Sequence, residues 1–469
     1  MPRISLCMIV KNEEANIAAC LDSAAGLVDE MIVVDTGSFD CTVQLARLHG
    51  ASVYPFKWKD NFSDARNAAI GHATGDWILS MDADERLDSS SHAAIRRAVE
   101  HPTADAYFTL LHNYLSQGPN PDRSDYALCR LWRNAEEHRF RGRVHEDIKP
   151  SITGAGGKIA PLDAVIHHYG YIPEVVAERN KHERNVSLLR QELADRPDDL
   201  YMTYHMAQEF FAVRDARSAI HYLKLAARLA PPEGGFVPDI YSHLADCLCD
   251  IGRPALAIKV LDRASAVHPQ LNFARGKALL LTNRNKEAAQ EFEAAIRLGT
   301  ERMWQGDCET WGYKAHYAAA LAWHSHGNDD AAIAHCERAL ELQPGHGDSH
   351  ELLVKSALRL GTRCAANGRY ADAIECFSKV VEVDPACAEA YFSAGDCLYA
   401  MERFSEAADV YLNGISHKPS HAPAYLAAGN CYFRMGARKA ATMAYKQAIA
   451  LRPDYFEAVN NLALVEDAA

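Results

Sequence analysis

Two aspartates after a short apolar stretch are the residues of this sequence best suited to chemistry. The stretch Trp77–Met81 leads directly into Asp82, Ala83 and Asp84. Alternate residues of an extended chain point to the same side, so both carboxylates can face one crevice if the stretch is a strand. Mg²⁺ and Mn²⁺ favour carboxylates together with substrate phosphates as ligands. The pair therefore predicts a divalent-metal site for a diphosphate, whereas the alternative is a solvated acidic turn closing a strand.

The residues up to about 195 alternate between short apolar stretches and helical patterns, and this alternation would position the two aspartates. Expected strands are 4–10, 30–35, 51–56, 77–81, 107–114 and 126–132, and expected helices are 16–25, 41–49, 63–72 and 89–100. Such alternation builds an α/β domain with a Rossmann-like, mostly parallel sheet and helices on both faces. These sheets bind ligands beyond the carboxyl ends of their strands, where Asp82 and Asp84 lie.

After about residue 198 the sequence becomes helical and repeats every 34 residues. The repeating positions are Pro385, Pro419 and Pro453; Gly361, Gly395 and Gly429; Ala373, Ala407 and Ala441; and Phe377, Tyr411 and Tyr445. A small residue where two helices cross, an aromatic residue and a helix-ending proline specify a helix–turn–helix unit that resembles the tetratricopeptide repeat. We expect an all-α solenoid of about seven repeats with a cap helix near Phe456–Glu466. The predicted domains are therefore 1–195 and 196–469.

Four motifs of the N-terminal part occur in an order that resembles the family 2 glycosyltransferases, which have the GT-A nucleotide-sugar fold. The motifs are Met8-Ile-Val-Lys-Asn-Glu-Glu14, Val33-Val-Asp-Thr-Gly-Ser38, Ala65-Arg-Asn67 and the Asp-Ala-Asp segment. The resemblance covers roughly residues 3–180, and the first 90 are its most specific part. Many members have Asp-Asp-Gly-Ser where this chain has Asp35-Thr36-Gly37-Ser38, which leaves open how Thr36 contributes to the site.

The resemblance implies roles for six residues in binding the nucleotide sugar. Val10, Glu13 and Asp35 would contact the base and ribose, and Arg66 would lie near the base or diphosphate. Asp82 would face the ribose or the metal, and Asp84 would coordinate the metal. The implied donor is a UDP-sugar, and the implied cofactor is Mn²⁺ or Mg²⁺.

A third segment contains the expected proton acceptor. Family 2 enzymes invert the anomeric centre and need a carboxylate to remove the proton of the attacking acceptor. In Phe140-Arg-Gly-Arg-Val-His-Glu-Asp147 the resemblance points to Glu146, with Asp147 as the second candidate. The alternative is that Glu146 is a surface residue or forms a structural ion pair with Arg141 or Arg143.

The segment Ile166-His-His-Tyr-Gly-Tyr171 contains a candidate for a further metal ligand. His168 resembles the histidine that many GT-A enzymes provide near the end of the domain, and histidine is a reasonable ligand for Mn²⁺. His167 is the alternative, since adjacent residues of a strand face opposite ways. Either histidine could instead be a packing residue.

Composition limits the classes of protein to which the chain can belong. Hydrophobic residues make up 48% and charged residues 24%, which excludes a mostly disordered chain. The net charge of −13 argues against a nucleic-acid binder that relies on bulk charge. No stretch approaches the ~18 apolar residues of a membrane span, and the 13 cysteines form no CxxC pair. We therefore expect a cytoplasmic protein with reduced thiols and no membrane span.

Together these observations predict a soluble, metal-dependent, inverting glycosyltransferase whose solenoid recruits a peptide or protein acceptor at Cys, Ser or Thr. The arrangement is similar to the soluble peptide S-glycosyltransferases of the sublancin type. The solenoid could also form a homodimer. The alternatives are extension of a saccharide chain, as in lipopolysaccharide or capsule, glycosylation of a modified nucleobase, and a catalytically inactive repeat scaffold.

Overall fold

The computed structural model describes residues 1–114, 123–170, 180–231, 236–301 and 310–467. The chain divides into two compact units. The first comprises Met1–Thr282 and Arg297–Thr310, and the second comprises Asn283–Ile296 and Trp311–Ala469. The predicted boundary between residues 195 and 196 lies inside the first unit and stays a prediction, since one compact unit can contain two domains.

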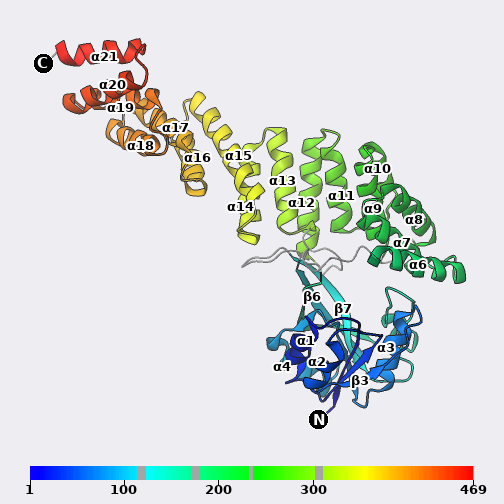
Figure 1. The fold of residues 1–469 in the computed structure, drawn as a ribbon. Coiled ribbons are helices and arrows are strands. Elements are labelled where there is room, and N and C mark those ends of the chain that lie inside the picture. Colours follow the sequence, from blue (N-terminus) through cyan, green and yellow to red (C-terminus); the bar gives the residue numbers. More distant parts are fainter. Residues whose placement is uncertain (115–122, 171–179, 232–235, 302–309, 468–469) are drawn as a thin grey trace. The chain divides into compact units, whose positions relative to one another are not determined.

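An eight-stranded sheet in the order β3-β2-β1-β4-β7-β6-β8-β5 forms the N-terminal part of the first unit (Figure 1). The strands are β1 (Ile4–Val10), β2 (Glu30–Asp35), β3 (Ser52–Pro55), β4 (Trp77–Ser80), β5 (Glu85–Leu87), β6 (Ala106–Tyr114), β7 (Arg123–Arg133) and β8 (Ile159–His168). Strands β3, β2, β1 and β4 are parallel, β7 is antiparallel to β4 and β6, and β8 is parallel to β6. The predicted mostly parallel α/β sheet is confirmed, and β5 and β8 are strands that the sequence pattern did not indicate.

Side chains alternate along the strands and build a hydrophobic core on each face of the sheet. The helices of this part are α1 (Ile17–Ala24), α2 (Thr42–Leu48), α3 (Phe62–Gly71), α4 (His92–Glu100) and α5 (Lys149–Gly154). Leu6 and Met8 of β1 share a core with residues of α1, α2 and α4. Cys7, between them, lies in the opposite core with Ile70 of α3 and Ile152 of α5. This arrangement confirms the expected helices on both faces.

The carboxyl ends of β2, β1 and β4 lie together at one edge of the sheet because the three strands are parallel neighbours. Strand β4 ends at Ser80, one residue earlier than predicted. A turn then follows, in which the backbone N–H of Glu85 donates to the carbonyl of Asp82 at 3.0 Å. Asp82 and Asp84 therefore lie in a turn between β4 and β5, so strand alternation does not explain how they are positioned.

Six helices follow the sheet in the described part of Met1–Thr282. They are α6 (Asn180–Asp195), α7 (Leu200–Ala212), α8 (Ala216–Leu229), α9 (Val237–Asp250), α10 (Pro254–Leu261) and α11 (Pro269–Leu280). Asp199 caps α7 by accepting from the N–H of Met202 at 3.0 Å, and Asp215 caps α8 by accepting from the N–H of Ser218 at 3.2 Å. These caps explain where α7 and α8 begin.

The second unit contains the regular repeats that the sequence predicts. After α12 (Asn285–Glu301), which is divided between the units, come α13 (Tyr313–His326), α14 (Asp329–Leu342), α15 (Gly347–Ala366), α16 (Tyr370–Val383), α17 (Ala388–Ala400), α18 (Phe404–His417), α19 (Ala422–Arg434), α20 (Arg438–Leu451) and α21 (Phe456–Asp467). Helix α21 packs on α20 at the predicted cap position.

The 34-residue period has a direct packing cause. A Cβ added at Gly361 would lie 2.7 Å from the ring of Phe377, and at Gly395 it would lie 2.7 Å from the ring of Tyr411. Each glycine thus leaves room for an aromatic ring from the next helix, and Gly429 repeats the arrangement with Tyr445 at 2.5 Å. Among the helices of the described ranges, none is both long and apolar enough to cross a membrane.

Candidate active site

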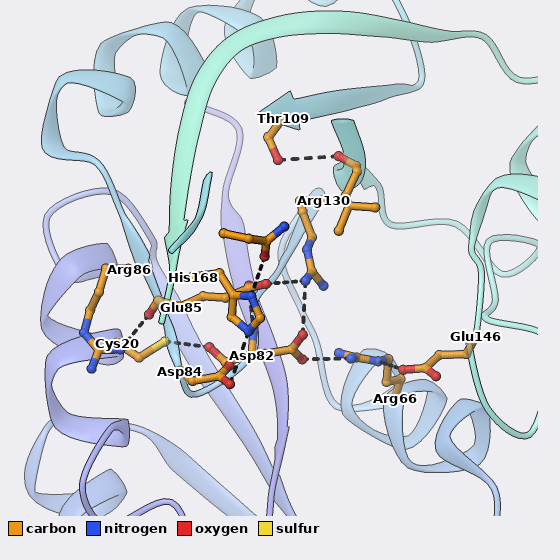
Figure 2. Close-up of polar contacts among 12 residues, drawn as sticks. Cys20, Arg66, Asp82, Asp84, Glu85, Arg86, Thr109, Arg130, Glu146 and His168 are labelled. Carbon is orange, nitrogen blue, oxygen red and sulfur yellow. Dashed lines mark hydrogen bonds and ion pairs between the residues drawn. The ribbon is translucent and has the colours of Figure 1, made fainter. Parts of the chain in front are cut away.

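Arg66 on α3 lies between two carboxylates that come from distant parts of the chain (Figure 2). Its Nη2 donates to Asp82 Oδ1 at 2.8 Å, and its Nε donates to Glu146 Oε1 at 2.5 Å. The Arg66 guanidinium also lies 5.4 Å from the centre of the Phe140 ring. The side chains of Arg66 and Glu146 are each only 11% exposed, so water screens this ion pair weakly.

Asp82 is held from its other side by a second arginine. Arg130 of β7 donates to Asp82 Oδ2 at 3.1 Å and also pairs with the buried carboxylate of Glu85. Burial alone would raise the pKa of Asp82, but Arg66 and Arg130 hold it well below its usual range. Asp82 is therefore an ionised acceptor that is already hydrogen-bonded at both oxygens.

Glu85 is 1% exposed, and burial has the larger effect on its carboxyl group. Burial raises the pKa of Glu85 although Arg130 lies beside the carboxylate. Glu85 Oε2 also accepts from the backbone N–H of Asp82 at 2.9 Å. Glu85 therefore fixes the turn that carries Asp82.

Asp84 lies beside His168 at the end of β8. Asp84 Oδ2 is 3.3 Å from His168 Nε2, and His168 Nδ1 is 2.5 Å from Asn113 Oδ1. His167, the alternative, faces the other way and lies 3.0 Å from Asp88 Oδ2. A Cβ added at Gly170 would lie 2.2 Å from Asp84 Oδ2, so a glycine is needed there for the pair to form.

The Asp84–His168 pair fits a divalent cation. When Nδ1–H of His168 donates to Asn113, the Nε2 lone pair faces the Asp84 carboxylate, and such a pair of electron donors is suited to a proton or a cation between them. Within the described ranges, no group of three or more His, Cys, Asp or Glu residues is arranged to hold a metal. A cation at this pair would therefore take further ligands from substrate phosphates, as Mg²⁺ and Mn²⁺ commonly do.

The residues expected to cradle the nucleotide lie at the ends of β1 and β2. Val10 and Asp35 are partners in the parallel register of these strands. Thr36 is 9% exposed, and its hydroxyl donates to the carbonyl of Val10 at 3.0 Å, so this threonine ties the two strand ends together. Asp35 accepts from the N–H of Ser38 at 3.0 Å, and Glu13 Oε2 accepts from Asn16 at 3.0 Å. These contacts order the edge of the sheet next to Asp82.

The two candidate proton acceptors have different surroundings. Glu146 pairs with Arg66 and, among the residues that the structure describes, with neither Arg141 nor Arg143. Arg143 instead donates to Asp195 at 3.0 Å. Asp147 Oδ1 accepts from the backbone N–H of Lys149 at 3.0 Å, which is a structural contact at the start of α5. Of the two carboxylates, Glu146 is the one that shares an arginine partner, Arg66, with Asp82.

The sequence reasoning assigned no role to four residues that complete this site: Glu85, Asn113, Arg130 and Gly170. Two of them carried a signal, because Glu85 directly follows the Asp-Ala-Asp segment and Gly170 directly follows His168 and Tyr169. Arg130 and Asn113 gave none, since their partners are 48 and 55 residues away in the sequence.

Comparison with known families agrees with this geometry. Residues 5–158 match the model described as glycosyl transferase family 2. The chain carries a family 2 glycosyltransferase domain. Residues 244–302, 312–346 and 358–422 match one tetratricopeptide-repeat model, and 422–455 match another. The family 2 match ends before His168, so the proposed role of that residue rests on its position beside Asp84.

Several curated proteins are similar to this chain. A TPR repeat-containing protein of Synechococcus elongatus is 36% identical over 52% of the chain and 61% of its own length. The SPbeta prophage-derived glycosyltransferase SunS of Bacillus subtilis is 28% identical over 48% of the chain and 53% of its own length. An uncharacterized glycosyltransferase of Rickettsia typhi is 36% identical over 36% of the chain and 61% of its own length. The chain thus spans less than two thirds of each of these relatives.

Proposed function

We propose that this chain transfers a sugar from a UDP-sugar to a Cys, Ser or Thr side chain of a peptide or protein, with inversion at the anomeric carbon. The observation that carries the proposal is the ion-pair chain in which Arg66 joins Asp82, at the sheet edge, to Glu146. A donor-binding carboxylate and a candidate proton acceptor are thereby separated by a single guanidinium group.

The donor half of the reaction uses the carboxyl edge of β2, β1 and β4. Val10, Glu13 and Asp35 would contact the base and ribose, and Arg66 would lie near the base or diphosphate. Asp84 and His168 would hold Mn²⁺ or Mg²⁺, with Asp82 beside them. When bound, the metal supplies positive charge that stabilises the leaving nucleoside diphosphate.

The acceptor half uses Glu146. Its carboxylate would take the proton of the acceptor hydroxyl or thiol while the acceptor oxygen or sulfur forms a bond to the anomeric carbon. The bond from that carbon to the diphosphate oxygen breaks, and its electron pair stays with the diphosphate. Arg66 orients the Glu146 carboxylate through their ion pair.

A polypeptide acceptor is supported by the repeats that follow the family 2 domain. Solenoids of helical hairpins present extended surfaces that suit peptide segments. Extension of a saccharide chain remains the second outcome of the test below.

The test is a two-step assay on the purified full-length protein. First, a panel of nucleotide sugars is incubated with the protein and Mn²⁺, and release of the nucleoside diphosphate is measured. Second, the accepted donor is supplied with cell proteins, and mass spectrometry locates the added sugar. A sugar on Cys, Ser or Thr is expected, whereas sugar found only on a glycan would contradict the polypeptide acceptor.

A further inference from the structure

The loop that carries Glu146 lies between the family 2 domain and the first repeat helices. On the side of α3, the Ser63 hydroxyl donates to the carbonyl of Gly142 at 2.6 Å, and the N–H of Phe62 donates to the carbonyl of Arg143 at 2.8 Å. On the side of α6, Glu192 Oε1 accepts from the N–H of Arg143 at 2.6 Å. The loop is thus fixed from two directions just before Glu146.

Apolar packing closes the same loop against α7. Val144 shares a buried cluster with Leu189 of α6 and with Met202 and Met206 of α7. Gly142 has a φ of +100°, and a Cβ there would lie 2.7 Å from the Met202 side chain. The loop therefore adopts its path in close contact with α7.

His145, the residue before Glu146, is the most constrained position of this loop. Its φ of +52° lies in the left-handed region, which is uncommon for residues other than glycine. Its ring stacks on His205 of α7 with centroids 4.0 Å apart and an 8° angle between the planes. Its Nε2 lies 3.2 Å from Glu209 Oε1, also on α7.

Glu209 is itself held by α6. Asn185 donates to Glu209 Oε1 at 2.7 Å, and His182 Nδ1 lies 3.3 Å from Oε2. Burial tends to raise the pKa of Glu209, but the hydrogen bonds from His145 and Asn185 lower it, so the carboxylate is ionised. The anchor for His145 is therefore a charged group with fixed partners.

His205 contacts His145 through its flat face. Both of its ring nitrogens are buried. Burial, and then the neighbouring His145, lower the pKa of His205 well below its usual value, which keeps the ring neutral. The role of this ring in the loop is therefore one of stacking.

We propose that His205 and Glu209 are positioning residues for Glu146, and that α7, the first helix of the predicted repeat domain 196–469, is a part of the transferase site. The inference rests on the proposed function, because it assumes that Glu146 accepts the proton. Glu209 and His205 act through the backbone at His145. They hold the His145 ring, and the side chain of the next residue, Glu146, then points toward Arg66.

The experiment compares full-length variants in the transfer assay, with thermal melting measured for each. Glu209→Ala is expected to lower kcat at least tenfold, while the donor KM stays within about threefold, because Glu209 contacts the loop and not the donor edge. Glu209→Gln, which keeps an oxygen for Asn185, should lie between wild type and Glu209→Ala. His221→Ala, an exposed residue of α8, is the matched control and should behave as wild type.

Two further comparisons separate positioning from general stabilisation. His205→Phe keeps a flat ring and should retain most of the kcat, whereas His205→Ala should lose it. Because Glu209 acts through His145, the double variant Glu209→Ala with His145→Ala should be no slower than the slower single variant.

Each outcome bears on the inference. A Glu209→Ala variant with native melting and a kcat within twofold of wild type would overturn it, and so would single-variant losses that multiply in the double variant. If Glu209→Ala melts early, the same comparison of melting and kcat is made with Glu209→Gln. A wild-type protein that consumes no nucleotide sugar would contradict the proposed function itself, which is a separate result from active wild type with insensitive variants.

Discussion

At the scale of single residues, one guanidinium group organises the candidate site. Arg66 contacts Asp82, 16 residues away, and Glu146, 80 residues away in the sequence. Motif order was enough to nominate these residues, because each lies in a short segment with a recognisable pattern. Their pairing was not predictable, because the sequence suggested Arg141 or Arg143 as partners for Glu146, and tertiary contacts decide between such choices.

Replacing Glu146 by Gln tests the assignment of the proton acceptor. The amide keeps the size of the side chain but cannot take a proton, so transfer should slow at least ~100-fold while donor binding stays near wild type. Asp147→Asn is the control, since the Asp147 carboxylate caps the backbone of Lys149. Slow transfer in Asp147→Asn with normal rates in Glu146→Gln would exchange the two assignments.

Gly170→Ala tests whether the Asp84–His168 pair binds the metal. The added methyl would meet Asp84 Oδ2 at 2.2 Å and His168 Nε2 at 2.7 Å, so the pair must separate. Mn²⁺-dependent donor binding, measured by calorimetry, should weaken at least ~10-fold. Gly154→Ala is the matched control because nothing lies within 4 Å of its added Cβ. Equal binding in both variants would contradict the metal assignment.

At the scale of secondary-structure elements, the periodicity of the sequence predicts the strands and helices that local sequence determines. Apolar stretches with the right length gave β1 to β4, and the 34-residue period gave the repeats. The short β5 and the half-exposed β8 were missed, because three residues carry no period and β8 mixes polar with apolar residues. The sequence pattern predicts that a strand delivers Asp82 and Asp84, whereas the structure has a turn there. Hydrogen bonds of Glu85 close this turn, and the apolar pattern gives no sign of them.

The contacts between glycine and aromatic rings make a prediction about stability. Gly395→Ala would place a methyl 2.7 Å from the ring of Tyr411, and overpacking of this kind destabilises by about 1–3 kcal/mol. Urea unfolding followed by circular dichroism measures the loss. Gly347→Ala, at the start of α15 with no atom within 4 Å of the added Cβ, should change stability by less than about 1 kcal/mol. Equal unfolding of the two variants would argue against the packing cause of the period.

At the scale of the whole molecule, the family 2 domain and the first repeat helices belong to one compact unit. Sequence texture changes near residue 195, which makes that point an obvious place to cut the chain. A protein ending at residue 195 would lack Met202, Met206, His205 and Glu209, the contacts of the loop before Glu146. This dependence could not be predicted from sequence, because it arises where two patterns meet in space.

A pair of truncations tests whether the site depends on the helices that follow residue 195. The chain 1–282 keeps these contacts and should release nucleoside diphosphate from the donor, whereas the chain 1–195 should melt early and show at most a few per cent of that rate. If the later repeats recruit the acceptor, 1–282 should also lose transfer to proteins. Full donor turnover by 1–195 would show that α7 is dispensable for the site.

The most direct test of the central claim measures diphosphate release from UDP-sugars by the full-length protein, with Mn²⁺ and with excess chelator, for wild type and Asp84→Asn. We expect release by wild type with Mn²⁺, a covalent sugar on a polypeptide acceptor, and loss of both with chelator or in Asp84→Asn. Release that is equal in all four conditions would contradict the claim that this edge of the sheet holds the metal and the donor.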